Sequence, residues 1–339
     1  MTPIRVLVVD DSAFARKVVR ESLRACDQIE IVGTARDGID ALEKIAALAP
    51  DVITLDLVMP NLDGLGVLAA LSPEQRRRVV VVSMAEGESD IGVSALAYGV
   101  FDLVHKPTAL AVAGLEDIAA ELVSKVLLAA AQPQNRPRIG SDEVAALPQA
   151  SSDQVVLIGT STGGPQALTK LLTALPSGFP APIAMVLHIP EGYTGPLSER
   201  LNAECAIEVR EASEGLALRP GLAILAKGGL HLMIVGSGDE PRVHLSSVGW
   251  SAPHRPSVDV LFESAARTVG RRALGVVLTG MGSDGLAGAR AIVEAGGRVL
   301  TETEDSCIVY GMPRVVKEAG LSTAEAPIEK MAAEIISRL

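Results

Sequence analysis

Aromatic residues are scarce in this sequence. Phenylalanine, tyrosine and tryptophan together make up 2% of the 339 residues, and the single tryptophan is Trp250. Sites that stack bases or sugar rings are built from such side chains, so no stacking platform is expected. Basic residues are also outnumbered, with 30 against 41 acidic residues and a net charge of −11. A chain of this charge has no general electrostatic attraction to nucleic acid or anionic lipid, and we expect no nucleic-acid partner.

Cysteines and long apolar runs are few as well. Cys26, Cys205 and Cys307 lie too far apart for a zinc pattern, and their odd number fits a reducing compartment. No apolar run approaches the roughly 18 residues that a membrane-spanning helix needs. The first residues also lack the pattern of an export signal. We therefore expect a cytoplasmic protein with no direct membrane insertion, and a monomer is the default oligomeric state.

The remaining composition is that of a folded protein with about two domains. Hydrophobic residues make up 48% of the chain, which is enough to build substantial cores. In residues 1–125, apolar runs alternate five times with stretches of helical period, which predicts a doubly wound sheet of about five parallel strands. Residues 126–152 are rich in proline and polar residues and predict a linker. Residues 153–339 predict a second α/β domain with a mostly parallel sheet and a short β-hairpin excursion.

The pattern of apolar residues places the individual elements. The expected strands are residues 4–9, 29–35, 51–57, 79–84, 102–106, 155–159, 183–189, 273–280 and 298–303, with 222–227, 231–235 and 242–246 in the excursion. The expected helices are residues 14–25, 39–48, 65–71, 90–98, 115–130, 165–175, 197–203, 258–270 and 285–295.

Charged residues stand at the ends of three predicted strands of the first domain. Asp10 and Asp11 end the first strand, Asp56 ends the third and Lys106 ends the fifth. Because the carboxyl ends of parallel strands meet at one edge of a sheet, the four side chains should converge. Three clustered carboxylates suit Mg²⁺ with phosphate as a further ligand, and a lysine can neutralise a phosphoryl oxygen. Each aspartate alone could be a loop or cap residue, so the prediction depends on the four together.

Two weaker candidates lie near this edge. Ser83 ends the fourth strand with a hydroxyl that could bond to a phosphoryl group, and Phe101 could change rotamer with it. The segments 6–12, 56–64 and 105–107 resemble the receiver domain of two-component response regulators, which has a flavodoxin-like sheet. The resemblance implies that Asp56 is the phosphoacceptor. It also implies that Asp11, Asp56 and the carbonyl of Val58 hold Mg²⁺, that Asp10 acts through water, that Lys106 contacts the phosphate, and that Ser83 and Phe101 are the switch pair.

Small residues surround a serine at the start of the second domain. The run Gly159-Thr160-Ser161-Thr162-Gly163 lies between an expected strand and an expected helix. Gly-x-Ser-x-Gly in this place is the nucleophile-elbow pattern, in which a tight turn exposes the serine hydroxyl at the sheet edge near a helix N-terminus. A glycine-rich turn that binds phosphate is the rival interpretation. However, no lysine follows at P-loop spacing, and no acidic residue follows at dinucleotide-site spacing.

Two later strand ends offer partners for Ser161. His188 ends the strand 183–189 and is the best placed of the five histidines to act as its base. Asp284 lies in a glycine-rich run after the strand 273–280 and could orient the imidazole. Taken singly, His188 could be a packing residue and Asp284 a helix N-cap. Together they predict a Ser-His-Asp triad whose chain order differs from that of the α/β-hydrolases, so a different sheet is expected.

Several segments of the second domain also resemble one family, namely residues 158–164, 188–190, 254–262, 279–285 and 306–314. They resemble the catalytic domain of chemotaxis protein-glutamate methylesterase, the CheB family, which joins a receiver to this domain through a linker. The resemblance implies a phosphorylation-activated hydrolase of glutamate γ-methyl esters, and a deamidase of glutamines, on methyl-accepting chemotaxis receptors. A chemotaxis histidine kinase would be the phosphodonor, and the hydrolytic step would need no cofactor. Met281 is then the expected oxyanion position, with Thr162 as a further site residue.

Other function classes remain open to the sequence. A DNA-binding response regulator would need a basic output domain, whereas residues 153–339 are net acidic and follow an α/β pattern. A non-enzymatic receptor adaptor would follow if Ser161 were unreactive. An esterase or amidase of a related, non-flagellar pathway would use the same chemistry on a different substrate.

Overall fold

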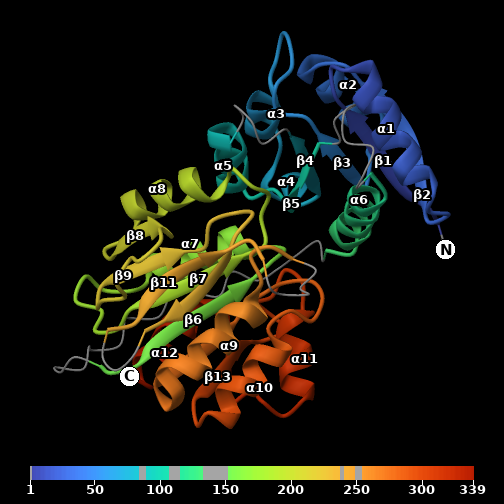
Figure 1. Cartoon of the computed structure of the whole chain (residues 1–339). Coiled ribbons are helices and arrows are strands. Elements are labelled where there is room, and N and C mark those ends of the chain that lie inside the picture. The colour runs from blue at the N-terminus through green and yellow to red at the C-terminus, as the bar shows by residue number, and fades with distance from the viewer. Residues whose placement is uncertain (1, 84–88, 107–114, 133–151, 237–239, 249–253) are drawn as a thin grey trace. The chain divides into compact units, whose positions relative to one another are not determined.

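The chain divides into two compact units, Met1–Pro137 and Arg138–Leu339 (Figure 1). The computed structural model describes residues 2–83, 89–106, 115–132, 152–236, 240–248 and 254–339. Most of the predicted linker lies outside these ranges, as do Met84, Pro107 and Trp250. Within the described ranges, no helix combines the length and the apolar character needed to cross a membrane.

The N-terminal unit is the predicted five-stranded parallel sheet, in the order β2-β1-β3-β4-β5. Its strands are β1 Ile4–Val9, β2 Ile29–Ala35, β3 Val52–Leu55, β4 Val79–Ser83 and β5 Asp102–His105. Its helices are α1 Ala13–Arg24, α2 Gly38–Leu48, α3 Gly64–Ala70, α4 Pro73–Arg76, α5 Ser89–Ala97 and α6 Leu115–Ala130. The strand order reverses between β1 and β3, and such a reversal opens a crevice at the carboxyl ends of these strands.

Local sequence explains how these elements form. The valine-rich β4 is buried on both faces, as an interior parallel strand must be. Helix α1 begins after Ser12, whose hydroxyl accepts the backbone N–H of Ala15. The short α4 was not predicted, because four residues are too few to show a helical period. It is started by a capping box between Ser72 and Gln75.

The C-terminal unit holds a seven-stranded sheet in the order β14-β13-β12-β6-β7-β9-β8, and all its pairings are parallel. The strands are β6 Val155–Thr160, β7 Ile183–Leu187, β8 Glu208–Glu211, β9 Leu222–Leu225, β12 Ala273–Val277, β13 Arg298–Glu302 and β14 Ala324–Ala326. The helices are α7 Gly164–Thr173, α8 Thr194–Glu204, α9 Val258–Val269, α10 Leu286–Glu294, α11 Met312–Glu318 and α12 Ile328–Ile336.

The predicted hairpin is formed by β10 His231–Val235 and β11 Arg242–Ser246, which pair in antiparallel register. The expectation that residues 222–227 belong to this excursion is wrong. Those residues form β9, which lies between β7 and β8 in the main sheet. All four residues of β9 are buried, so the strand needs cover on both faces, and only the sheet interior supplies it.

The first strand of this unit, β6, lies between β7 and β12. Helix α9 packs on β6, β12 and α10, while α7 packs on α8 and α12, so helices cover the sheet in separate layers (Figure 1). Because the chain leaves β6 toward β7 and returns to it from the other side through β12, the strand order reverses at β6. The carboxyl ends of β6, β7 and β12 therefore border the crevice where this class of sheet binds ligands.

Candidate catalytic and phosphorylation sites

The acidic residues predicted for the N-terminal unit do converge. One carboxylate oxygen from each of Asp10, Asp11 and Asp56 lies within 4.8 Å of the others. Asp10 and Asp56 are buried whereas Asp11 is exposed, so the group is reachable from solvent on one side. Lys106 Nζ lies 2.9 Å from Asp10 and 2.8 Å from Asp56. A donor set made only of carboxylate oxygens, open on one side, fits the hard cation Mg²⁺ with a phosphoryl oxygen as a further ligand.

The charges in this cluster influence one another. Burial is the largest influence on Asp10 and raises the pKa of its carboxyl, against the opposing effect of Lys106. Burial acts to lower the pKa of Lys106, but its pairs with Asp56 and Asp10 hold that pKa above the ordinary value. The lysine is therefore charged at neutral pH and offsets part of the carboxylate repulsion.

Of the two predicted switch residues, Ser83 lies at the sheet edge that carries the cluster and Phe101 does not. Ser83 is the last residue of β4 and is fully buried, and its carbonyl accepts the backbone N–H of Lys106 at 2.8 Å. Phe101 is buried directly before β5. Val58 follows Asp56 by two residues and has an exposed side chain. Ser83 and Val58 thus lie at the carboxyl edge of the sheet, whereas Phe101 lies at the amino end of β5, where its N–H donates to Val79, the first residue of β4.

A tight turn carries Ser161 from β6 into α7. Gly163 is the N-cap of α7 and has a φ of +79°, a backbone conformation that suits glycine. The carbonyl of Ser161 accepts the N–H of Gly164 at 2.7 Å, and its own N–H donates to Thr279 beyond β12 at 3.1 Å. A Cβ at Gly280 would lie 2.9 Å from the Cβ of Ser161, so glycine there lets the next loop approach the serine. Ser161 thus lies in a turn between a strand and a helix, the context that the predicted nucleophile elbow needs, but its own backbone does not have the positive φ of a strained elbow.

His188 lies next to this turn because of the strand register. Thr160 of β6 pairs with Leu187 of β7, so Ser161 and His188 are the next residues of two neighbouring strands. The N–H of His188 donates to the carbonyl of Thr160 at 3.1 Å. Paired strands lie about 5 Å apart, which brings the two side chains to the same point of the sheet edge.

Asp284 binds the imidazole of His188. Its Oδ2 lies 2.8 Å from Nε2 of His188, and both side chains are largely buried. An ionised carboxylate accepts hydrogen bonds, so Nε2 carries the proton and Nδ1 keeps its lone pair. Among the described residues, the buried Nδ1 has no hydrogen-bond partner. Sequence reasoning predicted the pair but not which ring nitrogen of His188 contacts Asp284.

The rest of the Asp284 carboxylate is bound by the start of α9. It accepts the Ser257 hydroxyl at 2.9 Å and the backbone N–H groups of Val258 and Asp259 at 2.7 and 2.9 Å. Burial alone would raise the pKa of Asp284, but His188 and these N–H groups hold it well below the ordinary value. The alternative that Asp284 is the N-cap of the following helix is wrong, because the N-cap of α10 is Gly285 and the Asp284 carboxylate instead accepts the first N–H groups of α9, whose own N-cap is Ser257.

Asp259, in the first turn of α9, in turn accepts hydrogen bonds from the N-terminal end of α10. Its Oδ1 accepts the backbone N–H groups of Gly285 and Gly288 at 2.9 and 2.7 Å. Burial raises the pKa of Asp259 to about 6, and the charge of Asp284 adds to this. Each of the two helix N-termini is therefore bound by an aspartate that belongs to the other. Of these two carboxyls, Asp284 has a lowered pKa and Asp259 a raised one.

Replacing Asp259 with Asn should stabilise the protein increasingly as the pH rises from 4 to 7. The raised pKa means that the native state favours the protonated form, so the contribution of Asp259 to stability is present at pH 4 and is lost through pH 6. Asn keeps the Oδ1 acceptor and cannot ionise, so at pH 7 we expect a gain of about 1–2 kcal/mol. Unfolding curves of both proteins across this pH range would measure it. A difference that does not change with pH would contradict the assignment.

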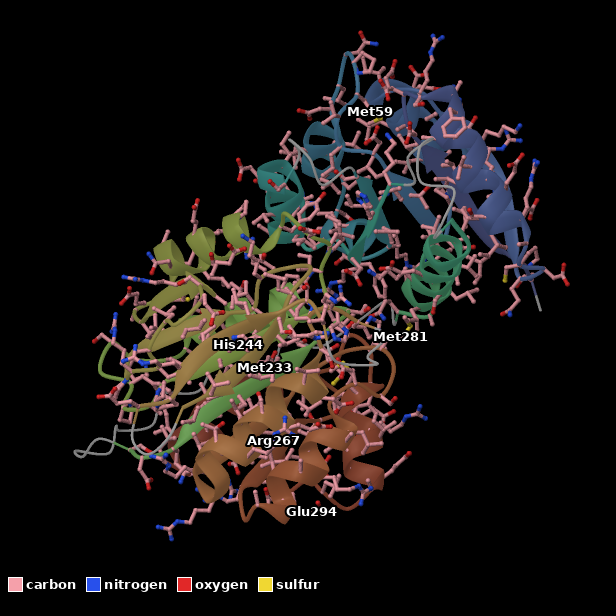
Figure 2. The ribbon with its side chains drawn as sticks, in the orientation of Figure 1. Met59, Met233, His244, Arg267, Met281 and Glu294 are labelled. Atoms are coloured by element: carbon pink, nitrogen blue, oxygen red, sulfur yellow. The ribbon has the colours of Figure 1, made fainter. Side chains whose placement is uncertain are left out.

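Three further residues border the proposed triad. The ring of His254 stacks on that of His188 with centroids 4.2 Å apart, a contact that sequence reasoning missed although the segment 254–262 had been noted. Thr162 is buried next to Ser161. Met281 lies between Gly280 and Gly282 in the loop from β12 to α10 (Figure 2). The predicted residues of the C-terminal unit therefore gather at the carboxyl ends of β6, β7 and β12.

Comparison with known proteins identifies the family of both units. The family model described as CheB methylesterase matches residues 156–335, and the model of the response regulator receiver domain matches residues 6–113. A protein-glutamate methylesterase/protein-glutamine glutaminase of Myxococcus xanthus is 58% identical over 98% of this chain and 97% of its own length. The chain belongs to the CheB family. The resemblance inferred from the sequence motifs is thereby confirmed.

More distant similarities are found both to a full-length relative and to a separate catalytic domain. A relative from Methanosarcina acetivorans is 41% identical over 98% of both chains. The crystal structure of the CheB methylesterase catalytic domain of Thermotoga maritima is 35% identical and covers 56% of this chain and 100% of that chain, with a TM-score of 0.54. The family and its domain order therefore extend over the whole chain.

Proposed function

We propose that Ser161, His188 and Asp284 catalyse the reaction of this protein-glutamate methylesterase/protein-glutamine glutaminase. The substrates would be γ-methyl esters of glutamate and particular glutamines on methyl-accepting chemotaxis receptors, so that the enzyme supports adaptation in chemotaxis. The observation that carries the proposal is the bond from His188 Nε2 to Asp284, which leaves Nδ1 at the strand end next to Ser161.

Hydrolysis would proceed in two acyl transfers. Ser161 Oγ attacks the ester or amide carbonyl while Nδ1 of His188 takes its proton. The tetrahedral intermediate then expels methanol or ammonia, which takes the proton from His188. A water molecule attacks the acyl-enzyme in the same way, with Nδ1 again as base. The glutamate carboxylate leaves and Ser161 recovers its proton.

The groups around Ser161 and His188 would stabilise the charges that develop during the reaction. Asp284 holds the tautomer of His188 and stabilises the imidazolium that forms in both steps. The backbone N–H of Met281, in its glycine-rich loop, is the proposed oxyanion donor, with Thr162 beside the nucleophile as a further site residue. No metal is required for these steps.

The N-terminal unit would act as a phosphorylation-controlled receiver, with domain boundaries at residues 1–125, 126–152 and 153–339. Asp56 is the proposed phosphoacceptor, and Asp10, Asp11, Asp56 and the carbonyl of Val58 would hold Mg²⁺ directly or through water. When bound, Mg²⁺ would neutralise the transferring phosphoryl group. Lys106 would contact the phosphate and Ser83 would respond to it, while Phe101, the other predicted switch residue, lies at the amino end of β5. A cytoplasmic chemotaxis histidine kinase would supply the phosphoryl group.

Replacing Asp56 with Asn should abolish both phosphorylation and activation. Asn lacks the nucleophilic carboxylate oxygen, so a small phosphodonor with Mg²⁺ should label the wild-type protein and leave the variant unlabelled. Esterase activity of the variant should then stay at its basal level. The matched control is Asp27→Asn, which changes an exposed aspartate in the turn before β2. Equal labelling of wild type and Asp56→Asn would rule out this phosphoacceptor.

The proposed activity is tested by methanol release from membranes that carry methylated chemoreceptors, and by ammonia release from receptors with the corresponding glutamines. A fluorophosphonate that labels Ser161 would exclude the adaptor alternative. Labelling without methanol or ammonia release would instead point to an esterase of a related pathway.

A further inference from the structure

Thr279 occupies a central position behind the proposed nucleophile. It follows β12 and is 1% exposed. Its carbonyl accepts the N–H of Ser161 at 3.1 Å and the hydroxyl of Thr160 at 2.7 Å. Its own hydroxyl donates to the carbonyl of Thr162 at 2.9 Å. One residue thus binds all three residues from the end of β6 to the start of the turn.

The hydroxyl of Thr279 is itself fixed from the other side. It accepts the backbone N–H of Val309 at 2.9 Å, and the carbonyl of Thr162 at 2.9 Å is a closer acceptor for its proton than the carbonyl of Val309 at 3.4 Å. The backbone N–H of Thr279 donates to Oε2 of Glu302 at 2.8 Å. The orientation of Thr279 is therefore determined by two segments that lie far from the nucleophile in the sequence.

Glu302 is a buried carboxyl with no part in the proposed acyl transfers. It ends β13, is 1% exposed, and accepts the Ser306 hydroxyl at 2.8 Å through its second oxygen. Burial raises the pKa of this carboxyl. Placing an ionisable group there is costly unless its hydrogen bonds serve a purpose, and the bond that leads toward the catalytic turn is the one to Thr279.

We propose that Thr279, oriented by Glu302, is a positioning residue for the catalytic turn and sets the place of Ser161 relative to His188. This inference rests on the proposed function of Ser161. Thr279 touches no reacting atom, but its three hydrogen bonds fix the backbone on both sides of the nucleophile. Because no hydrogen bond joins Ser161 to Nδ1 of His188 among the described residues, the position of the turn decides whether the serine hydroxyl reaches that nitrogen.

The test compares Thr279→Val, which keeps the shape and removes the hydroxyl, with Thr279→Ser, which keeps the hydroxyl. For methanol release by the full chain, Thr279→Val should lower kcat about 30-fold with little change in KM, because misplaced groups impair the chemical step rather than binding. Thr279→Ser should recover most of the loss. The rate at which a fluorophosphonate labels Ser161 should fall and recover in parallel.

Two variants of Glu302 provide a second comparison in which Thr279 itself is unchanged. Glu302→Gln keeps an acceptor for the Thr279 N–H and should stay close to wild type, whereas Glu302→Met should lower kcat as Thr279→Val does. Thermal unfolding identifies any variant that fails to fold. If a Thr279 variant does not fold, the Glu302 variants are compared, and the reverse.

The outcomes separate this inference from the function on which it rests. If Ser161→Ala retains turnover, the proposed function fails and this inference fails with it. If turnover requires Ser161 but folded Thr279→Val and Glu302→Met have the wild-type kcat and labelling rate, only the positioning role is overturned. A loss of stability with unchanged kcat would likewise show a structural role and overturn the proposal.

Discussion

Ser161→Ala is expected to lower the turnover of methylated receptors by a factor of about 10⁴, because the neighbouring hydroxyls of Thr160 and Thr162 are buried and cannot take its place in the acyl-enzyme. The change removes one oxygen atom from a half-buried side chain whose backbone is held by Thr279 and Gly164, so the fold should be unaffected. Methanol release under substrate saturation measures the effect. Labelling by a fluorophosphonate should disappear in the same variant.

The matched control for this experiment is Ser337→Ala. Ser337 is an exposed serine at the C-cap of α12 and lies outside the proposed site. It should retain full turnover and labelling. An Ser161→Ala protein that releases methanol at nearly the wild-type rate would exclude Ser161 as the nucleophile.

Asp284→Asn should reduce kcat by about 10³ to 10⁴ while substrate binding changes little. Asn has nearly the same shape, but its amide can present N–H to Nε2 of His188. That contact favours the tautomer in which Nδ1 carries the proton and cannot act as base. Asn also weakens the bonds that the carboxylate accepts from Ser257 and from the start of α9. Steady-state kinetics separates the expected loss in kcat from any change in KM.

The pH dependence of stability distinguishes this prediction from general damage. The lowered pKa of Asp284 means that its contribution to stability is present above about pH 4 and is lost on acidification below that value. Asp284→Asn should therefore be less stable than wild type at neutral pH, with the difference shrinking in acid. Asp305→Asn, which changes an exposed acid after β13, serves as the control and should alter neither kcat nor stability. A full kcat in folded Asp284→Asn would remove the aspartate from the triad.

The strands of the N-terminal sheet and the interior strands of the C-terminal sheet could be predicted from sequence, whereas the two edge strands of the C-terminal sheet could not. Strands such as β4 and β7 are continuous apolar runs because helices cover both of their faces. The edge strand β8 reads Glu-Val-Arg-Glu, and the other edge strand, β14, has three residues, so neither shows such a run. Helices α11 and α12 were missed for a different reason. No strand was predicted after residue 303 to mark where they begin, and the segment 306–314 served only as a family motif.

The reactive side chains of the proposed site could be predicted from sequence. The backbone groups that hydrogen-bond to them could not. Ser161, His188 and Asp284 could be found because reactive residues at the ends of parallel strands meet. The partners of Asp284 at the start of α9 could not, because the approach of α9 and α10 depends on packing. The same holds for Glu302, whose carboxylate resembles any other strand-end acid until its burial is known.

Strand β6 pairs with β12, which follows it by more than 100 residues in the sequence. This separation determines when esterase activity can first arise during protein synthesis. Thr160 and Thr279 are bonded partners 119 positions apart in the chain, and Glu302 comes later still. A ribosome-bound chain that has exposed Ser161 and His188 still lacks β12, Asp284 and the residue that holds the nucleophile turn. Because such long-range strand pairing forms only when the distant segments are available, the nascent enzyme stays inert until almost all of it has been translated. Esterase activity is thus a sensitive report that the C-terminal unit has folded completely.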